Sequence, residues 1–394
     1  MADIADIVVV GGGVHGASTA WHLAKRNAGK IVLIEKDAIA SGASGWSSAI
    51  VRMHYQLESL VKVTMYGREM YGDWENIVGV GESGFRKVGF LVLFPEDEIE
   101  HGHSVIKMQQ RLGIDARYIS RDEISQIEPR LSIEDVAAGA WEPNSGYADG
   151  STVANSFVAA ARSLGVEVRI GPEVIALTSV DEKITGVETS EGMIHAGTVI
   201  VEAGFRTSAL LAHHGVDLPI VPVRHAIAVV KRTQDFGDIH PVVSDRVARA
   251  YYRPEAENLT LLGEHDPLRG PVDEEVEVTK LPQMDEQVSL MERFSRRFPG
   301  QDSASMMRGY TGVYDCSPDF QPAFGKVQAL DGLFVGAGFS GHGFKLSPGI
   351  GKIISDLVID GSTDMIDVSP FRIERFAEDD LLLGGEGYSN RSLA

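Results

Sequence analysis

The feature that most constrains this chain is a glycine-rich turn near its beginning, where an apolar strand meets a helix. Residues 6–10 form a run of strand-forming residues, and an apolar periodic pattern predicts a helix over 17–25. Between them lie three glycines in a G-x-G-x-x-G arrangement, Gly11, Gly13 and Gly16. The first permits the turn, the second lets a pyrophosphate approach the backbone, and the third lets helix and strand pack closely. We therefore expect a dinucleotide-binding unit.

The residues around this turn indicate which dinucleotide is bound. Its phosphates would lie at the N-terminus of the predicted helix, against Val14 and His15, where free N–H groups and the macrodipole favour negative charge. A second strand is predicted over 30–34, and Glu35 at its end is placed to bind ribose hydroxyls, with Lys36 beside it. Because a carboxylate repels a 2′-phosphate, the pattern favours FAD or NAD over NADP.

The bulk composition is that of an acidic globular protein. Lys and Arg total 36 against 56 for Asp and Glu, which gives a net charge of -20 and a pI near 5.0. Such a surface disfavours nucleic acid or an anionic membrane as a partner. The 394 residues are enough for two domains with ample cores.

Cysteine and histidine give no sign of a metal site. Cys316 is the only cysteine, so no intrachain disulfide or cysteine cluster can form, and we expect a buried thiol. His101 and His103 lie on a polar predicted helix without nearby partners, and we expect them to be solvated. No run approaches the roughly 18 apolar residues of a membrane helix. Because the nucleotide strand begins almost at the N-terminus, we expect no presequence and a cytoplasmic location.

The stretch after Glu35 is a loop of small and hydroxyl residues over 41–48. Such a loop can hold a flat polar ring against the main chain or be a flexible surface loop, and composition alone leaves both open. Its candidate cofactor contacts are Gly42, Ser44, Ser47 and Ser48.

Further patterns predict the remaining elements. Helices are expected at 56–74, 101–112, 150–164, 284–298 and 347–360, with a short helix opened by a capping box at Ser120 and Glu123. Strands are expected at 85–94, 166–170, 174–177, 220–230, 248–253, 259–263 and 306–313, with 184–188 and 198–201 read as hairpin-like.

These elements indicate an α/β (α+β) fold in two parts. A Rossmann-like cofactor domain is expected to be discontinuous, over residues 1–84, 145–218 and 318–377. Residues 85–144 and 219–317 are expected to form a substrate domain on a mainly antiparallel sheet. Residues 378–394 form a tail, of which 384–394 are expected to be poorly ordered.

A second glycine-rich turn follows a buried strand near the C-terminus. Residues 333–338 are apolar and end in glycine, and a helix is predicted over 347–360. Between them lie the candidate cofactor contacts Gly338, Gly341, His342, Gly343, Phe344 and Lys345. This turn is interpreted as a second one facing the cofactor.

Together these motifs resemble the FAD-dependent oxidoreductases of the D-amino-acid oxidase superfamily, most closely the sarcosine oxidase branch. The resemblance spans nearly the whole chain and is carried by 11–16 with Glu35, 50–52, Ala203 and Gly204, Tyr314, Pro318 and Asp319, and 338–345. It implies FAD bound across two domains, with its ring at their interface and further contacts from Val174, Ala203 and Gly204.

The resemblance also implies a reaction. The family oxidises a carbon–nitrogen bond of an amino acid or N-methyl amino acid, with hydride passing to flavin N5, hydrolysis of the imine, and reoxidation by oxygen with release of peroxide. Arg52 and Lys345 match the residues that hold the substrate carboxylate, and Tyr314 matches a pocket residue. A cationic pair fixes a carboxylate and aims the C–H bond. His342 is expected beside the flavin, and the helix from Ser347 is expected to stabilise negative charge on it.

Two departures qualify the resemblance. Several sarcosine oxidases attach FAD through a cysteine where this chain has Gly312, so we expect noncovalent FAD. The lysine that promotes reaction with oxygen in the monomeric enzymes has no counterpart, because no lysine lies between Lys231 and Lys280. Arg249 and Arg253 are candidates for that charge, and another electron acceptor is the alternative.

Several readings therefore stay open. Alternatives are a dehydrogenase, a flavin subunit of a hetero-oligomer, and an oxidase of 2-hydroxy acids. An NAD-dependent dehydrogenase would explain the first turn but not the second. Substrate, stereochemistry and homo- or hetero-oligomeric state are not indicated, and the orientations of His225, Tyr251 and Tyr252 cannot be derived from sequence.

Overall fold

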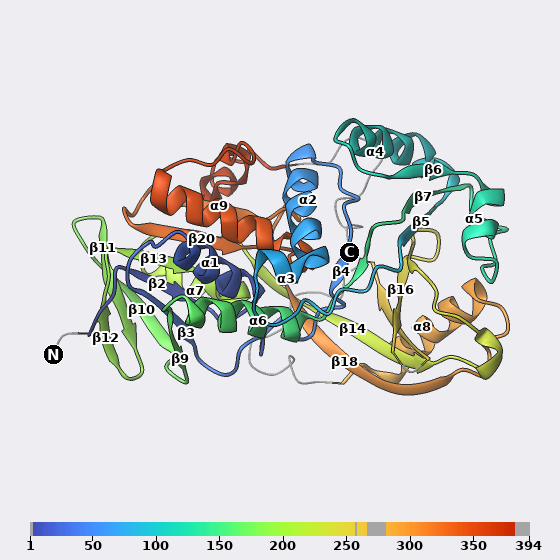
Figure 1. Cartoon of the computed structure of the whole chain (residues 1–394), viewed down its shortest axis with the longest axis horizontal. Helices are drawn as coiled ribbons and strands as arrows, with labels where there is room; N and C mark the ends of the chain where they lie inside the picture. Colours follow the sequence, from blue (N-terminus) through green and yellow to red (C-terminus); the bar gives the residue numbers. More distant parts are fainter. Residues whose placement is uncertain (1–2, 257, 266–280, 383–394) are drawn as a thin grey trace.

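The computed structural model describes residues 3–256, 258–265 and 281–382. Figure 1 shows two layered parts along the long axis, one around a mainly parallel sheet and one around an antiparallel sheet. This arrangement confirms the predicted α/β (α+β) fold. The expected poorly ordered segment 384–394 lies outside the described residues.

The first part is a six-stranded sheet with helices on one face. Its order is β19-β20-β13-β2-β3-β9, parallel except at the β19 edge. The strands are β2 (Ile7–Val10), β3 (Ile31–Glu35), β9 (Glu167–Ile170), β13 (Thr198–Val201), β19 (Ala323–Lys326) and β20 (Leu333–Ala337). Helix α1 (Val14–Lys25) packs between α6 (Gly150–Ser163) and α9 (Ser347–Asp360).

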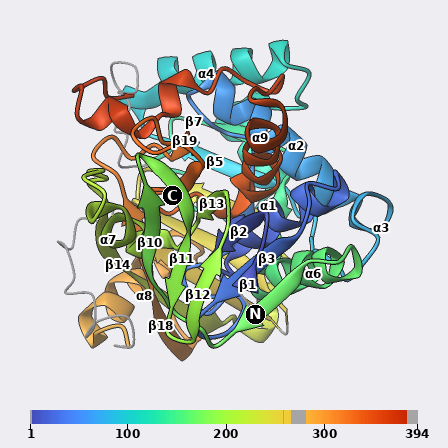
Figure 2. The same ribbon diagram turned by 90° about the vertical axis from the view of Figure 1, so that its left-hand side faces the viewer.

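The other face of this sheet is covered by a smaller one. Its order is β1-β12-β11-β10, formed by β1 (Asp3–Ile4), β10 (Val174–Val180), β11 (Lys183–Thr189) and β12 (Gly192–His195). Figure 2, viewed from that end, shows β10, β11 and β12 in front. Both faces of β2 are buried, because Val9 packs with the helices while Val8 and Val10 pack with the smaller sheet.

One predicted pairing was wrong. The segments 184–188 and 198–201 do not pair with each other: β11 pairs with β10 and β12, and β13 lies between β2 and β20. The physical reason is burial on two faces, since Val199, Ile200 and Val201 are all fully buried. A strand of this kind suits the centre of a covered parallel sheet.

The second part is an eight-stranded sheet of order β18-β14-β17-β16-β15-β5-β7-β6. All pairs are antiparallel except β15 with β5. The strands are β5 (Phe90–Phe94), β6 (Arg117–Ile119), β7 (Ala138–Glu142), β14 (Val221–Lys231), β15 (Val242–Asp245), β16 (Ala250–Glu255), β17 (Leu259–Glu264) and β18 (Ser305–Cys316). The sheet therefore joins strands from both segments assigned to the substrate domain, whose limits remain a prediction.

Helices and short elements complete the fold. The second part carries α4 (Ile99–Arg111), α5 (Arg121–Ile127) and α8 (Met284–Arg297), and α5 opens with the predicted capping box. The others are α2 (Glu58–Gly72), α3 (Trp74–Ile77), α7 (Thr207–Ala212), β4 (Ile50–Val51) paired with β8 (Gly146–Tyr147), and the 3-10 turn η4 (Phe344–Leu346). Within the described residues, no helix has the length and apolar character needed to cross a membrane.

Two predicted elements are shorter in the structure. The strand expected over 85–94 begins only at Phe90, because Gly89 has a φ of 82° that interrupts extended backbone. The helix expected over 56–74 ends at Gly72, and Trp74 begins a separate short helix.

Candidate active site

The first glycine turn has no room for side chains at two of its positions. Gly11 has a φ of +113°, and a Cβ on it would lie 2.4 Å from the Glu202 carbonyl oxygen. A Cβ on Gly16 would lie 2.0 Å from the Gly11 carbonyl oxygen. Gly13 is the N-cap of α1, and the Ser44 hydroxyl accepts a hydrogen bond from the Val14 N–H over 3.0 Å. The turn thus presents backbone donors at a helix N-terminus, where an anion is stabilised.

Glu35 is fixed at the end of β3 by backbone donors. Its Oε2 accepts from the Gly12 N–H at 2.8 Å, and its Oε1 accepts from the Asp37 N–H at 2.9 Å. Lys36 lies next to it, 3.5 Å from a Glu173 carboxylate oxygen. Each carboxylate oxygen can accept a further hydrogen bond, so Glu35 can also bind ribose hydroxyls.

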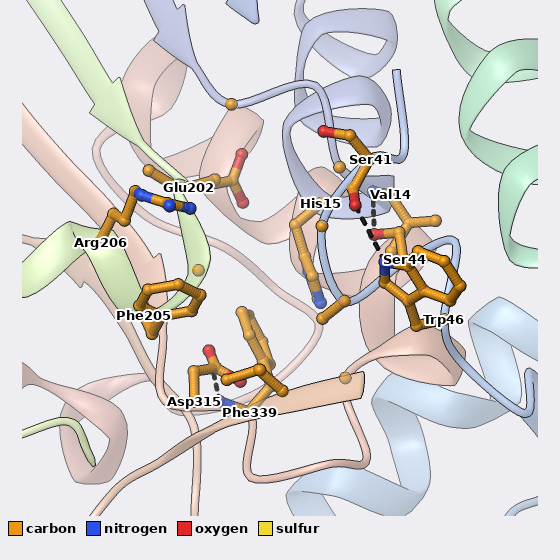
Figure 3. Close-up of a pocket in the computed structure, with 18 of the residues that line it drawn as sticks. Val14, His15, Ser41, Ser44, Trp46, Glu202, Phe205, Arg206, Asp315 and Phe339 are labelled. Carbon is orange, nitrogen blue, oxygen red and sulfur yellow. Dashed lines mark hydrogen bonds between the residues drawn. The ribbon is translucent and has the colours of Figure 1, made fainter. Parts of the chain in front are cut away.

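A cavity of about 570 Å³ extends from this carboxylate to the antiparallel sheet. Figure 3 shows part of its wall, with Val14 and Ser44 on one side, Glu202 and Phe205 on another, and Asp315 with Phe339 below. Of the candidate cofactor residues, those that line it are Gly11, Gly13, Val14, His15, Glu35, Lys36, Gly42, Ser44, Ser47, Ser48, Val174, Ala203, Gly204, Gly341, Gly343 and Phe344. The loop 41–48 therefore forms a wall of the cavity.

Four candidate residues lie outside this wall. Gly16 acts by close packing, and Gly338, at a φ of 72°, lies against Ser317. Lys345 lines a second cavity, described below. His342 is the fourth.

His342 was expected beside the flavin, and its side chain lies outside the wall of the larger cavity. The ring is fully buried, with Nε2 3.0 Å from the Phe320 carbonyl oxygen and Nδ1 3.3 Å from the Tyr55 hydroxyl. These two partners fix the orientation of the ring, and its place beside the flavin stays a prediction.

His15 provides the imidazole at the cavity wall instead. Its ring stacks on Phe339, with centroids 3.6 Å apart and planes 12° apart. Burial lowers the pKa of His15 to about 3, and the Gly343 backbone beside the ring opposes this shift only in part. A neutral ring at this wall is available to a bound ligand.

The second glycine turn is held by Asp315 at the end of β18. The Asp315 Oδ2 accepts from the Gly338 N–H at 2.8 Å and from the Phe339 N–H at 3.1 Å. A Cβ on Gly341, whose φ is +86°, would lie 2.5 Å from the Tyr314 ring. The turn therefore packs its backbone directly against Tyr314.

A second, small cavity of about 10 Å³ brings the three predicted substrate residues together. Arg52, Lys345 and Tyr314 all line it. It shares Ser48, Tyr251, Tyr314 and Gly341 with the larger cavity, so the two adjoin. Arg52 is 4% exposed and Lys345 5% exposed, so both basic side chains are removed from bulk water.

Aromatic rings fix the position of Arg52. Its guanidinium lies 4.5 Å from the centre of the Tyr55 ring and 5.8 Å from that of Phe90, and one N–H donates to the His54 carbonyl oxygen. Burial and the nearby Arg52 charge hold the pKa of Lys345 well below its usual range. The pair offers donors suited to a carboxylate.

Sequence reasoning missed how the antiparallel sheet completes this site. The Tyr251 hydroxyl lies 3.0 Å from His225 Nε2, and the His225 ring stacks on Tyr314 with centroids 4.5 Å apart. Burial raises the pKa of Tyr251 and lowers that of His225 to about 4, so both are neutral at pH 7. Tyr252 points to the opposite face, into the core around Phe294.

Gly263 makes this contact between strands possible. Gly263 on β17 pairs with Ile227 of β14 on one side and with Tyr251 of β16 on the other. A Cβ on Gly263 would lie 2.3 Å from the Tyr251 ring. The phenol therefore crosses the intervening strand over a glycine to reach His225, and only the sheet order reveals this.

The residues named for covalent attachment and oxygen activation are placed as follows. Gly312 lines the larger cavity, and a Cβ there would lie 3.3 Å from the Trp46 Cβ. Cys316 is buried, as expected, and lines neither cavity. Arg249 and Arg253 also line neither, and Arg253 pairs with Glu255. Within the described residues, no group of three or more His, Cys, Asp or Glu could hold a metal.

The larger cavity fits FAD. The glycine backbone and the N-terminus of α1 suit the pyrophosphate, and the Glu35 carboxylate suits a ribose. The buried His15 ring at the cavity wall can contact a polar group of the cofactor. The opposite end lies between the second glycine turn and Tyr314, next to the cavity of the cationic pair.

Comparison with known proteins identifies a family. Residues 6–357 match the model of the family described as FAD dependent oxidoreductase (DAO). The chain is similar to 4-methylaminobutanoate oxidase (formaldehyde-forming) of Paenarthrobacter nicotinovorans, at 28% identity over 94% of this chain and 45% of that protein. It is similar to sarcosine oxidase subunit beta of Arthrobacter sp, at 25% identity over 94% of this chain and 91% of that one. Human mitochondrial sarcosine dehydrogenase is 24% identical, with 94% and 41% covered. The chain thus spans less than half the length of the first and third relatives.

Solved structures share the fold over nearly the whole chain. L-proline dehydrogenase from P. horikoshii has a TM-score of 0.88 at 27% identity, covering 97% of this chain and 100% of that one. Glycine oxidase from Geobacillus kaustophilus has a TM-score of 0.82 at 24% identity, covering 95% and 99%, a likeness of fold alone.

Proposed function

Because the chain belongs to the FAD dependent oxidoreductase (DAO) family, we propose that it oxidises the carbon–nitrogen bond of a secondary or N-methyl amino acid to an imine, which water hydrolyses. The observation that carries this proposal is the cavity shared by Arg52, Lys345 and Tyr314, which adjoins the cavity that fits FAD. The names of the similar proteins, among them methylaminobutanoate oxidase, sarcosine oxidase and L-proline dehydrogenase, support the same substrate class.

The protein contributes position and electrostatics. When bound, FAD supplies the redox chemistry by accepting a hydride from the substrate carbon. Arg52 offers a planar fork of donors to the substrate carboxylate, and the rings of Tyr55 and Phe90 restrict its movement. Fixing the carboxylate at one end orients the C–H bond at the other. The low exposure of Arg52 and Lys345 strengthens both contacts, since little water screens them.

Noncovalent attachment of FAD is part of this proposal. Gly312 has no side chain to attach, and Cys316, the only cysteine, lines neither cavity. Burial raises the pKa of Cys316 to about 12, which keeps its thiol protonated and unreactive. Flavin should therefore stay in solution after acid precipitation of the protein, and flavin in the precipitate would contradict this part.

We propose two electron acceptors for the reduced flavin. The favoured one is oxygen, with release of peroxide. A partner protein in a hetero-oligomer is the second, and it is supported by the likeness to sarcosine oxidase subunit beta over 91% of that subunit. Oxidation of a 2-hydroxy acid is the remaining alternative for the substrate, since the same cationic pair would hold its carboxylate.

The test is an anaerobic absorbance spectrum of the flavin-loaded protein mixed with sarcosine, other N-methyl amino acids, proline, D-amino acids and 2-hydroxy acids, followed by admission of air. Bleaching by a secondary amino acid with fast recovery and peroxide supports an oxidase. The same bleaching with slow recovery supports the partner acceptor. Bleaching by hydroxy acids alone, or by nothing, overturns the substrate class.

The variant Arg52→Met tests the carboxylate contact directly. Losing a charge-assisted bond should lower kcat/KM for the amino acid by about 10- to 100-fold, with FAD content unchanged. Arg162→Met on the exposed side of α6 is the matched control, since Arg162 lies outside both cavities. Equal turnover in the two variants would remove Arg52 from the substrate site.

A further inference from the structure

We propose that Lys345 enters the reaction as a neutral amine and takes the proton that the substrate ammonium must lose before its carbon–nitrogen bond is oxidised. The inference rests on the proposed function, because it concerns the same small cavity. It assigns Lys345 a proton-transfer role in addition to holding the carboxylate.

The surroundings of Lys345 disfavour a charged amine in the substrate-free protein. The side chain is 5% exposed and shares a cavity of only about 10 Å³ with the Arg52 side chain. Among the described residues, the lining of this small cavity contains no carboxylate, and the Lys345 amine has no ion-pair partner. Two like charges in so small a buried space repel, and arginine does not give up its proton in proteins. Lys345 is therefore the residue of the pair that loses its proton.

The other groups around Lys345 do not supply a compensating negative charge. The titratable neighbours are Tyr251 and Tyr314 from the antiparallel sheet, which burial keeps un-ionised, and His342 from the adjacent turn, which burial keeps neutral with a pKa of about 3. Glu142 does not line this small cavity, and its carboxylate accepts hydrogen bonds from the Met53 N–H, the Ser145 hydroxyl and the Gln109 amide.

Burial and the Arg52 charge accordingly hold the pKa of Lys345 well below its ordinary value. Arrival of the substrate carboxylate reverses this balance, because a negative charge beside the amine favours its protonated form.

The substrate brings the proton that Lys345 then holds. An amino acid in neutral water is a zwitterion, and its ammonium has no lone pair to form the imine double bond. Transfer of one proton gives a neutral substrate amine and a Lys345 ammonium. No electron moves, no bond other than N–H changes, and the net charge of cavity plus substrate stays constant. The carboxylate is then held by two cations, and the nitrogen lone pair is free.

A carboxylate without a transferable proton separates this idea from simple binding. Methoxyacetate has the shape of sarcosine with an ether oxygen in place of the amine. Added to the flavin-loaded enzyme at pH 8 in weak buffer with a pH indicator, it should cause uptake of about one proton per flavin, together with a shift of the flavin spectrum. A spectral shift without proton uptake would overturn the proposal and leave the proposed function standing. Absence of any spectral shift, combined with no bleaching by amino acids, would instead overturn the proposed function.

Lys345→Arg provides the second readout, because it keeps a positive charge but cannot accept a proton. It should bind methoxyacetate without proton uptake. Its rate of anaerobic bleaching by sarcosine at pH 7 should fall by about 100-fold, and it should recover as pH rises and free amine forms in solution. A variant that is slowed equally at every pH would show that Lys345 only positions the substrate, and would overturn the proposal.

Discussion

The two ends of the larger cavity differ in what forms their walls. At the parallel-sheet end, the wall includes the glycine turns that follow β2, β13 and β20. At the antiparallel-sheet end, the wall is made of side chains from β14, β16 and β18, including His225, Tyr251 and Tyr314. The parallel-sheet end therefore depends on glycines, which leave room for the backbone to pack closely. The antiparallel-sheet end depends on side chains that the sheet brings together.

This difference predicts two kinds of sensitivity to mutation. At the backbone end, a Cβ added at Gly11 or at Gly16 meets a carbonyl oxygen of the main chain, which cannot move without distorting the turn. At the side-chain end, backbone hydrogen bonding can survive a substitution while the site loses its alignment. Cofactor binding should fail at the first end, and turnover should fail at the second.

Gly16→Val is expected to have the largest effect. The new Cβ would lie 2.0 Å from the Gly11 carbonyl oxygen and would force α1 away from β2. The helix N-terminus would no longer face the phosphate position, so the purified protein should contain no FAD. Flavin absorbance per protein after gel filtration measures this.

Gly197→Val is the matched control for that substitution. Gly197 precedes β13 in the same part of the molecule, and a Cβ there meets nothing within 4 Å. It should retain FAD. Full flavin content in Gly16→Val would mean that the backbone end tolerates side chains, and the comparison between the two ends would fail.

One side chain at the backbone end departs from this pattern. Glu202 follows β13 and is 5% exposed, and the nearby Thr19 hydroxyl offsets only part of the cost of burying its charge. Burial raises the pKa of Glu202 to about 8. The folded protein therefore keeps a proton that the unfolded chain loses near pH 4.5, so the stabilising effect of this proton is full at low pH and disappears as pH rises to about 8.

Glu202→Gln should remove this pH dependence. Between pH 5 and pH 9 the free energy of unfolding of the natural protein should fall by up to about 4 kcal/mol more than that of the variant. Urea unfolding at saturating FAD, repeated across this pH range, measures both curves. Parallel curves would show that Glu202 is ionised throughout, with a partner outside the described contacts.

The comparison also explains what could be predicted from sequence. The glycine turns were predictable because a tight turn of this kind needs residues without a Cβ, and glycine shows this in the local sequence. Both turns line the larger cavity. Arg52 and Lys345 came from the family resemblance, and the structure brings them together. The ring of His342 could not be oriented, because Tyr55 and Phe320 hold it from distant segments.

The antiparallel part was predictable as a set of strands but not as a site. The contact of Tyr251 with His225 depends on β17 lying between their strands and on Gly263 falling at the crossing point. Neither the strand order nor this register can be predicted from the sequence of a single segment. The same limit applies to β13, whose place between β2 and β20 is set by burial on both faces.

Gly263→Val therefore tests the side-chain end, with the smallest expected effect. Its Cβ would displace the Tyr251 phenol from His225, and a misplacement of this size costs about 100-fold in the rate of anaerobic flavin bleaching by substrate. FAD content should be unchanged, because the glycine turns are untouched. Tyr251→Ala and the double variant complete a mutant cycle. If Gly263 acts only by leaving room for Tyr251, the double variant should be no slower than Tyr251→Ala alone. Additive losses would mean that Gly263 supports the site by another route, and that the side-chain end does not depend on this single crossing.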